Sequence, residues 1–528
     1  MSQPATAQTY VLAIDLGSGG PKVGLVDDNG VVVASAVERC AIHLLPDGGA
    51  EQDPHEWWAA VRQATKRVVA AAGVPPTAIT AVSCTSQWAV VVPVDANGEP
   101  VMNAIHWLDT RGGPYNRKIA QGFPSIQGYG AYKLYRWITK VGLPPTLSGV
   151  DSLGHMLYIK NERPEIYRKT DKFLEPMDYL NLRLTGKCAA SQITALPFLM
   201  TDNRRATTEY DPWLVQVSGV DPAKLPDLLP NDAVHGTVLP EVAADLGIAS
   251  GAVVIVASND NHSAAIGAGA IADGEAVAVL GTSGFLATHL ASKKSDLTHL
   301  LTSIPSPLPD RYLLLAELGN TGKVLESFLN NLVYGMDPLA VDAVAASALP
   351  ADRFSLAAEL AGQAPPGSEG VLFMPWFNGS LAPSEEPAMR GGFLGLSHKT
   401  TRAALVRSVF EGIAMNWRWL LGPSQKLVGR QFDHLRLGGG GALSDFWAQV
   451  MADVCGIPIH QLADPRNANV RGAAFLALQR LGLLTFAEIP KLVPIAQVYQ
   501  PDPARHALYS RQFERFQAAF KANRGVYG

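Results

Sequence analysis

Short apolar runs alternate with glycine-rich turns at the start of the chain. Tyr10–Ile14 and Lys22–Val26 predict two strands, and the glycines of Asp15–Pro21 predict the turn between them. Asp28-Asn29-Gly30 supplies a second tight turn, after which Val31–Val37 predicts a third strand. The chain is therefore predicted to open as an antiparallel meander.

A helix and two more strands follow this meander. Gln52-Asp53-Pro54 predicts a helix start, with aspartate as the cap and proline in the first turn. An amphipathic pattern runs from there to Ala72, and Gly73 predicts the helix end. Because Ile79–Cys84 and Ala89–Val94 are apolar runs of strand length, this half is predicted to be a strand-rich α/β unit.

The second half repeats the pattern of strand, glycine turn and strand. Glu275–Leu280 and Phe285–His289 predict the strands, and Gly281-Thr282-Ser283-Gly284 predicts the turn. A repeated device of this kind favours a duplicated α/β architecture, with a cleft between its halves, over one continuous sheet.

A run of four glycines marks the last third of the chain. Gly438–Gly441 follows a predicted strand at Leu435–Leu437 and precedes predicted helices over Ser444–Cys455 and Val470–Leu481. Consecutive glycines carry an entropic cost, so a simple connecting turn would not ordinarily use four. Bare backbone at this point could lie flat against an adenine ring or a ribose.

Length supports a division into domains, because 528 residues exceed what one hydrophobic core usually serves. We predict an N-terminal domain over residues 1–256 and a C-terminal domain over residues 257–528. Between residues 112 and 150 no clear period is visible, so this stretch is predicted to be an irregular insertion.

Composition and charge exclude several classes of protein. Apolar residues make up 47% and charged residues 17%, which is typical of a compact enzyme, and a net charge of −4 gives no basic field that would attract nucleic acid. Four dispersed cysteines show no metal-ligand spacing. The polar segment Met1–Thr9 has no secretory pattern, and no apolar run approaches the length of a membrane span. The sequence thus predicts a cytoplasmic protein that binds neither nucleic acid nor a membrane.

The first glycine turn, Asp15–Gly20, can be compared with nucleotide-binding loops. A dinucleotide-binding fold would need a helix after the glycines, but Pro21 and a predicted hairpin follow instead. No GxxxxGK[ST] motif occurs, which excludes a Walker loop. A phosphate-gripping hairpin remains, with Asp15 facing Mg²⁺ and Lys22 near the transferred phosphate. The simpler alternative is an ordinary turn.

The second hairpin weakens that alternative because the same form would have to arise twice. Thr282 and Ser283 bring hydroxyl groups that can donate hydrogen bonds to phosphate. We therefore favour the phosphate-gripping hypothesis for both turns.

Asp260 is the carboxylate of greatest interest. It follows a buried apolar run and precedes a helix of small residues predicted at Ser263–Ala272. A carboxylate in this place either caps the helix or acts in a cleft, and the two roles are compatible because a helix N-terminus keeps a carboxylate ionised. His262 is interpreted as a polar neighbour and not as a second base.

Several segments, in order and over nearly the whole chain, resemble the FGGY carbohydrate kinases, and most of all their xylulokinase-like members. Beside the two glycine hairpins, the resemblance rests on Glu51–Pro54, Trp107–Arg111, Leu174–Gly186, Gly370–Pro375, Asn378-Gly379, Gly391–Leu396 and Gly438–Asp445. It implies an ATP-dependent sugar kinase with a two-domain, actin-like (ribonuclease H-like) α/β fold and a cleft between the domains. By the same resemblance, the domain over residues 1–256 is predicted to bind the sugar and the domain over residues 257–528 to bind ATP.

The hairpins and the resemblance together predict a set of site residues. Asp260 is predicted to be the catalytic base, and Asp15 to orient Mg²⁺. The predicted ATP contacts are Asp15, Ser18, Gly19, Lys22, Gly281, Thr282, Ser283, Gly322, Gly440, Gly441, Ala442 and Asp445. The sugar is predicted to lie near Gln87, Trp88, Trp107, Asp109, Asn261 and Phe285.

Two departures from the family pattern affect the substrate and the surface. Xylulokinase-like members carry Met-His after the residue that matches Gln87, whereas this chain has Trp88-Ala89, which removes a polar side chain from the expected sugar pocket. Trp88 could stack on a sugar face or simply fill the core. The long Gly112–Val150 stretch could cover the cleft or form a contact in a homodimer.

The predicted substrate is a ketose such as D-xylulose, phosphorylated at its terminal hydroxyl, with another ketose or a polyol as the alternative. Two other functions remain open: an actin-like or chaperone-like ATPase, and a sugar sensor without turnover. No peptide-binding module follows Leu483, and Asp15, Thr282 and Asp260 are all present, which favours the kinase.

Overall fold

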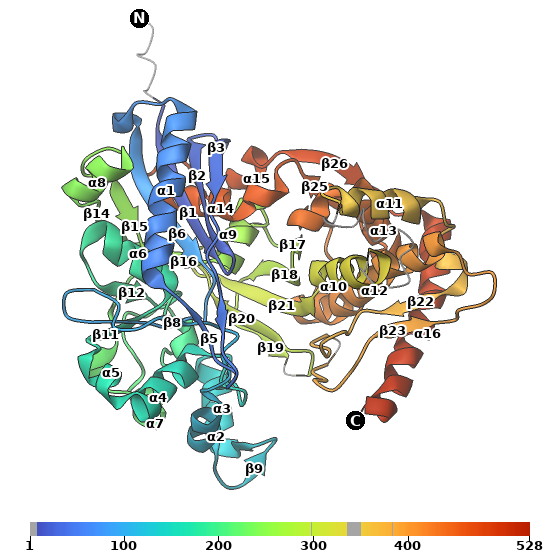
Figure 1. Cartoon of the computed structure of the whole chain (residues 1–528), viewed down its shortest axis with the longest axis horizontal. Coiled ribbons are helices and arrows are strands. Elements are labelled where there is room, and N and C mark those ends of the chain that lie inside the picture. The colour runs from blue at the N-terminus through green and yellow to red at the C-terminus, as the bar shows by residue number, and fades with distance from the viewer. Residues whose placement is uncertain (1–7, 297, 335–349, 383, 528) are drawn as a thin grey trace, which may run out of the picture.

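The computed structural model describes residues 8–296, 298–334, 350–382 and 384–527. Within these ranges the chain forms two lobes, each built around a large sheet (Figure 1). Blue and green segments make up most of one lobe, and yellow to red segments make up most of the other.

The first sheet carries the N-terminal meander. Its strands β1, β2 and β3 are antiparallel, whereas β1, β6 and β15 are parallel, and β16 pairs with the end of β6. In order across the sheet these strands are β14 (Val234–Thr237), β15 (Val253–Ile255), β6 (Ile79–Ser86), β1 (Tyr10–Gly17), β2 (Gly20–Asp27) and β3 (Val32–Val37), with β16 at Ser258–Asn259.

The second sheet repeats this plan. Its hairpin β17–β18 is antiparallel, as β1–β2 is, and β17 runs parallel to β24, as β1 does to β6. The order is β19 (Ser295–Asp296), β20 (Leu301–Pro305), β21 (Tyr312–Asn320), β18 (Ser283–Leu290), β17 (Glu275–Leu280), β24 (His434–Gly438), β25 (Ile459–Leu462) and β26 (Ile495–Tyr499). The predicted duplication of an α/β unit is confirmed.

Local signals placed two helices correctly. Helix α1 (Pro54–Ala72) begins after Asp53, whose side chain accepts a hydrogen bond from the His55 N–H at 2.8 Å. It ends at Gly73, which has a φ of 62°. Helix α13 (Asp445–Cys455) begins after Ser444, as its predicted start required.

Helix α9 (Asp260–Gly267) corrects the prediction of a helix over Ser263–Ala272. The Asn259 side chain accepts a hydrogen bond from the His262 N–H at 3.1 Å, so Asn259 is the cap and the helix starts earlier. Asp260, whose position in the sequence suggested a capping role, therefore does not cap this helix.

Residues 112–150 are more regular than the predicted irregular insertion. They contain α2 (Gly113–Ala120), a short hairpin of β9 (Ser125–Ile126) and β10 (Tyr129–Gly130), and α3 (Ala131–Lys140). Glycine and proline interrupt these elements, which hid their period. The division of the chain between residues 256 and 257 stays a prediction.

The remaining elements cover the sheets and the rim. The helices are α4 (Ser152–Glu162), α5 (Pro164–Lys169), α6 (Pro176–Thr185), α7 (Pro212–Ser218), α8 (Pro240–Leu246), α10 (Gly322–Phe328), α11 (Arg353–Gly362), α12 (Arg402–Val428), α14 (Ala468–Arg480), α15 (Ile489–Leu492) and α16 (Pro503–Tyr527). The short strands are β4 (His43–Leu44), β5 (Ala50–Gln52), β7 (Val92–Val94), β8 (Ala104–Ile105), β11 (Lys172–Leu174), β12 (Ala189–Ser191), β13 (Asp227–Leu229), β22 (Leu372–Met374) and β23 (Gly392–Leu394). Over the described ranges, none of these helices combines the length and the apolar character needed to cross a bilayer.

Helix α14 lies against α9 and the first sheet, although it comes late in the sequence (Figure 1). The two helices touch backbone to backbone. A Cβ added to Gly267 would lie 1.8 Å from the carbonyl oxygen of Ala468, and one added to Gly472 would lie 1.9 Å from that of Ser263. This contact fixes the position of α9, the helix that begins with Asp260.

Replacement of Gly472 by alanine is therefore expected to lower the free energy of unfolding by about 1–3 kcal/mol, because the added methyl overpacks a backbone contact. Denaturant unfolding measures this change. Gly362→Ala is the control: Gly362 lies at the end of α11, where an added Cβ meets nothing within 4 Å. Equal stability of the two variants would contradict the proposed close packing.

Candidate active site

Two predicted carboxylates meet at one end of the first sheet. Across β1 and β6, Asp15 pairs with Thr85, and across β6 and β16 Thr85 pairs with Ser258. Asp260 follows β16 directly as the first residue of α9. Because the carboxyl ends of parallel strands share one edge, the topology brings Asp15 and Asp260 to the same place.

The Asp260 carboxylate has few protein partners. Its Oδ1 accepts a hydrogen bond from the Asn261 N–H at 2.9 Å. The pKa of Asp260 is raised to about 7, first by burial and then by the negative charge of Asp15, against the lowering effect of the Asn261 N–H. A carboxyl group with a pKa near neutrality is suited to accept a proton.

Asp15 is 8% exposed, and its Oδ1 is buried without a hydrogen-bond partner. Burial raises the pKa of Asp15, and the charge of Lys22, its cross-strand partner, opposes that shift. An unsatisfied buried carboxylate oxygen suits a divalent cation. In the described ranges no group of three or more His, Cys, Asp or Glu side chains could hold a metal. One carboxylate with substrate phosphates and waters is, however, the usual environment of Mg²⁺, so the residues present fit this ion.

The first hairpin turns at Ser18 and Gly19. An added Cβ on Gly19 would meet no atom within 4 Å, so the backbone is open on that side. The Ser18 hydroxyl donates its hydrogen to Oε1 of Gln87 at 2.6 Å, so in this structure that hydrogen is used in a bond within the protein. Lys22 is half-buried and donates to the carbonyl oxygen of Arg466. Their contact with phosphate stays a prediction.

The second hairpin packs against the start of α10. The Gly322 N–H donates to the Gly281 carbonyl oxygen at 2.9 Å, and a Cβ on Gly322 would lie 2.4 Å from that same oxygen. Thr282 and Ser283 are exposed at the tip. The structure thus brings together four of the residues predicted to hold phosphate.

The glycine run lies beside this hairpin, because β24 pairs with β17. Gly439, with a φ of 82°, approaches the Leu280 carbonyl so closely that an added Cβ would lie 2.6 Å from its oxygen. Gly440 is open, since a Cβ added there would meet nothing within 4 Å. The Gly440–Leu443 turn leads to Asp445, whose Oδ1 accepts from Tyr499 Oη at 2.8 Å.

Ala442 is buried, and its carbonyl oxygen accepts a hydrogen bond from Nε2 of Gln461 at 2.7 Å. The same Gln461 Nε2 lies 3.1 Å from Oδ1 of Asp445. Gln461 therefore links Ala442 and Asp445, two of the predicted nucleoside contacts.

Gln87 lies at the centre of a buried network under the first hairpin. Its Oε1 accepts from Ser18 and from Nε2 of His106 at 3.0 Å, and its Nε2 donates to Gln52 Oε1 at 2.9 Å. One amide hydrogen of Gln87 remains for a ligand. Gln52 and His106 were absent from the predicted site, and only the three-dimensional contact reveals them.

His106 is neutral in this network. Its Nδ1 accepts the Leu108 N–H, so Nε2 carries the hydrogen that Gln87 accepts. The pKa of His106 is lowered to about 4, first by burial and then by nearby His155, against the raising effect of the Asp109 charge. This residue is a fixed hydrogen-bond donor and brings no positive charge to the pocket.

Asp109 is fully buried in an ion pair with Arg111, whose Nη2 lies 2.7 Å from Oδ2. The carboxylate also accepts from the Ala50 N–H at 2.9 Å, and Arg111 Nη2 pairs with Glu51 at 2.7 Å. These contacts hold the Trp107–Arg111 segment in place. Direct contact of Asp109 with a sugar stays a prediction.

The aromatic residues of the predicted sugar site differ in exposure. Trp107 is 40% exposed, and its Nε1 donates to Oγ of Ser18 at 3.0 Å, so its ring is held beside the hairpin. Trp88 is half-buried and packs against the first-lobe core, and Phe285 packs against a core cluster that includes residues of both lobes. Asn261 is 6% exposed, next to Asp260. Trp107 is the ring best placed to meet a ligand.

Glu317 is a third acidic residue that the sequence did not reveal. It lies opposite Phe285 in the β18–β21 pair. The Glu317 side chain is exposed to solvent. Partial loss of hydration raises the pKa of Glu317, and its charge is one of the smaller contributions to the raised pKa of Asp260. Its position on a long apolar strand carries no motif, which is why sequence patterns did not identify it.

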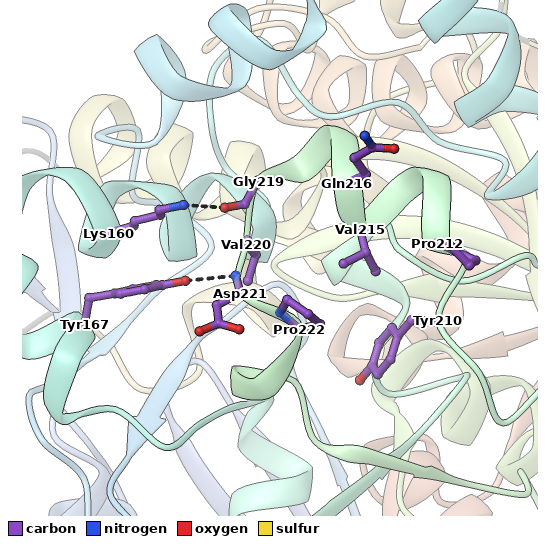
Figure 2. Close-up of a pocket in the computed structure, with 10 residues that line it drawn as sticks. All are labelled: Lys160, Tyr167, Tyr210, Pro212, Val215, Gln216, Gly219, Val220, Asp221 and Pro222. Carbon is purple, nitrogen blue, oxygen red and sulfur yellow. Dashed lines mark hydrogen bonds between the residues drawn. The ribbon is translucent and has the colours of Figure 1, made fainter.

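A cavity of about 720 Å³ lies elsewhere, between α4, α5 and α7 (Figure 2). Two of its polar side chains are bonded within the protein, since Lys160 donates to the Gly219 carbonyl and Tyr167 accepts the Asp221 N–H at 3.0 Å. It contains none of the predicted site residues.

Comparison with known families agrees with the paired hairpins. The N-terminal domain of the FGGY family of carbohydrate kinases matches residues 10–267, and the C-terminal domain matches residues 276–480. The chain belongs to this family. FGGY membership makes it a carbohydrate kinase and confirms the predicted two-domain, actin-like fold and the predicted transfer of phosphate to an alcohol group.

Individual relatives carry different substrate names. The chain is 28% identical over 524 residues to a xylulose kinase of Staphylococcus epidermidis, covering 97% of this chain and 96% of that one. It is 25% identical over 475 residues to a gluconokinase of Bacillus subtilis, covering 90% and 88%. The structure of Plasmodium falciparum glycerol kinase with ADP superposes with a TM-score of 0.81 at 21% identity and covers 98% of both chains. These relatives are named for three different substrates.

The pKa of Asp260 predicts an acidic limb in the rate profile. A base must be deprotonated to act, so kcat/KM is expected to fall as the pH drops through about 7. Since the charge of Glu317 raises this pKa, Glu317→Gln is expected to move the limb to lower pH. Glu241→Gln, at an exposed position on α8, is the control. A limb that stays in place in Glu317→Gln would contradict the electrostatic link.

Proposed function

We propose that this kinase transfers the γ-phosphoryl group of ATP to the terminal hydroxyl of a neutral ketose, with D-xylulose as the first candidate. The observation that carries the proposal is Asp260. Its carboxylate begins α9 at the edge of the sheet that also presents Asp15, it is not used as a cap, and its pKa is raised to about 7.

In this reaction the acceptor hydroxyl oxygen forms a bond to the γ-phosphorus, and the bond from that phosphorus to the β,γ-bridging oxygen breaks. Asp260 accepts the hydroxyl proton, and ADP leaves with the electron pair of the broken bond. Phosphoryl transfer asks for alignment and charge neutralisation more than covalent catalysis. The two glycine hairpins provide open backbone for that alignment.

Asp15 would hold Mg²⁺ through its unsatisfied Oδ1. When bound, this ion would neutralise charge on the phosphates. In the absence of the cation, the negative charge of Asp15 contributes to the raised pKa of Asp260. A bound cation would offset that charge and favour the ionised form of Asp260.

The charges around the predicted sugar pocket support a neutral substrate over a sugar acid such as gluconate. Arg111 is paired with Asp109 and Glu51, and His106 is neutral. Glu317 adds negative charge next to Phe285. A substrate carboxylate in this place would meet acidic neighbours. Among these described residues the one cation, Arg111, is already paired.

Two non-kinase alternatives are disfavoured. An actin-like or chaperone-like ATPase would hydrolyse ATP without a sugar, and a sensor would bind sugar without turnover. The chain belongs to a family of carbohydrate kinases, and Asp260 does not serve as the cap of α9. Both observations support transfer to an alcohol.

Replacement of Asp260 by asparagine is expected to lower kcat for sugar phosphorylation by about 10²- to 10⁴-fold, because the base is removed while the helix start is kept. A coupled ADP assay measures the rate, and calorimetry with ATP checks that nucleotide binding is preserved. Asp53→Asn is the matched control, since asparagine also caps helices and Asp53 lies at the start of α1. Near-normal turnover in Asp260→Asn would remove the proposed base.

The substrate proposal is tested by assaying pentuloses, hexuloses, pentitols, glycerol and gluconate with the same assay. D-xylulose is expected to give the highest kcat/KM, and gluconate a low one because of the acidic pocket. A clear preference for gluconate would contradict the charge argument, and ATP hydrolysis unaffected by any of these compounds would favour the ATPase alternative.

A further inference from the structure

The edge of the second sheet is hydrogen-bonded to the first lobe. Thr302 on β20 donates to the Gly142 carbonyl oxygen at 3.3 Å, and Tyr312 Oη on β21 donates to the Arg204 carbonyl oxygen at 2.8 Å. His262 on α9 lies with Nε2 2.8 Å from the Pro305 carbonyl oxygen. We call this row of contacts the seam.

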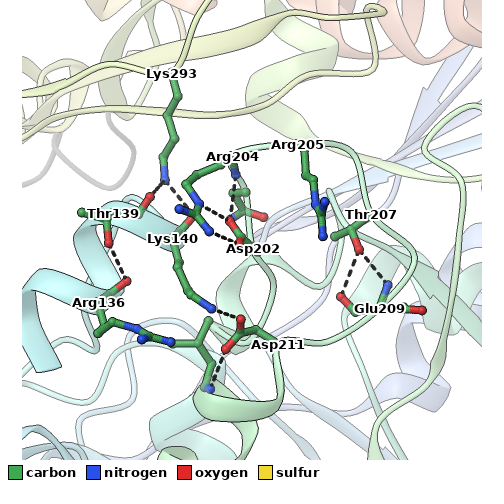
Figure 3. A network of polar contacts seen from close by, with 12 residues as sticks. Arg136, Thr139, Lys140, Asp202, Arg204, Arg205, Thr207, Glu209, Asp211 and Lys293 are labelled. Atoms are coloured by element: carbon green, nitrogen blue, oxygen red, sulfur yellow. Dashed lines mark hydrogen bonds and ion pairs between the residues drawn. The ribbon is translucent and has the colours of Figure 1, made fainter.

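Lys293 contributes a charged contact to the seam. It lies in the turn between β18 and β19, and its Nζ donates to the carbonyl oxygens of Thr139 at 3.0 Å and Lys140 at 2.7 Å (Figure 3). These are the last carbonyls of α3, which have no partner inside their own helix and carry the negative end of its dipole. An ammonium group is therefore well matched to this helix end.

The neighbouring Lys294 does the same thing within one lobe. Its Nζ donates to the carbonyl oxygens of Leu427 at 3.0 Å and Val428 at 3.2 Å, at the end of α12. Two consecutive lysines thus cap two helices. Of the two, Lys293 is the one that joins the second lobe to the segment formed by residues 112–150, which Thr302 also contacts at Gly142.

A cavity of about 800 Å³ beside Lys293 has many cationic side chains, which raises the question of an anion site. Those charges already have partners: Arg204 pairs with Asp202 at 2.6 Å, and Lys140 pairs with Asp211 (Figure 3). Arg136 lies over the Trp213 ring at 4.6 Å. The cluster is therefore explained by contacts within the protein, and its role is to join segments.

Lys293 connects the far ends of two predicted ligand-binding segments. Strand β18 starts with Ser283 and Phe285 at the predicted phosphate and sugar sites and runs directly into the Lys293 turn. On the first lobe, the Trp107–Arg111 segment leads into α2 and then α3. A shift at the Lys293 contact would therefore move the phosphate hairpin relative to the sugar side of the cleft.

We propose that Lys293 is a positioning residue for phosphoryl transfer, which fixes the second-sheet hairpin relative to the first lobe by holding the end of α3. This inference rests on the proposed kinase function for its catalytic consequence, because a misplacement of about 1 Å between reacting groups costs roughly 10²-fold in rate.

The charge of Lys293 depends on pH. Burial lowers its pKa to about 8, the charge of Asp202 raises it and that of Arg204 lowers it; the other charged groups around it are the Lys140–Asp211 pair, Arg136 and Lys294. The ammonium form is present below about pH 8 and is lost as the pH rises through that value. The contact with α3 is expected to weaken over the same interval.

The test compares Lys293→Gln, Lys293→Arg and the matched control Lys294→Gln in the full chain. With the best sugar substrate, Lys293→Gln is expected to lower kcat about tenfold or more, while Lys294→Gln stays within about twofold of the unaltered enzyme. Lys293→Arg is expected to restore the rate at pH 7.5 and to abolish a decline that the unaltered enzyme shows above pH 8, because arginine stays charged.

Hydrogen exchange gives a readout that needs no turnover and so separates this inference from the proposed function. Peptides that cover residues 137–143 are expected to exchange faster in Lys293→Gln than in Lys294→Gln or Lys293→Arg. Equal exchange in the three variants would overturn the contact itself. Faster exchange with unchanged kcat, or an alkaline decline that persists in Lys293→Arg, would overturn its positioning role.

Discussion

The close approach of two carboxylates at the end of one sheet is the constraint on which the rest of this structure depends. Asp15 is buried and Asp260 is half-buried, and the negative charge of Asp15 adds to the cost of ionising Asp260. Such an arrangement costs stability unless a ligand uses it. A cation at Asp15 and an alcohol at Asp260 are the partners that would relieve the two unfavourable features.

The backbone contact between α9 and α14 makes this arrangement rigid. Glycines at positions 267 and 472 allow the two helices to touch without side chains between them. Helix α14 in turn packs against β1, the strand that carries Asp15, so it links the helix that begins with Asp260 to that strand. The same fold repeats its hairpin in the second lobe, so the predicted nucleotide side is built from the same pattern of strands as the predicted sugar side.

Local signals in the sequence were enough to predict much of the fold. Helix α1 was predicted from Asp53, Pro54 and Gly73, and both glycine hairpins were predicted from turn residues between apolar runs. The start of α9 was misplaced because Asn259 and Asp260 are equally good caps in the sequence, and only the hydrogen bond to the His262 N–H decides between them. The candidate site was harder to predict from the sequence. Gln52, His106 and Glu317 belong to it through contacts between residues far apart in the chain, and such contacts produce no periodic pattern in the sequence.

Identity of the sugar depends on charges and shapes that no single motif encodes. Trp107, the Gln87 network and the acidic Glu317 are the features on which the proposal of a neutral polyhydroxyl substrate rests. The proposed role of Asp260 as the base is tested most directly by a crystal structure with a non-hydrolysable ATP analogue and the preferred sugar. The account predicts an Asp260 carboxylate oxygen roughly 2.6–3.2 Å from the acceptor hydroxyl, on the side opposite the γ-phosphate. An Asp260 carboxylate outside hydrogen-bond reach of every sugar hydroxyl in that closed complex would contradict it.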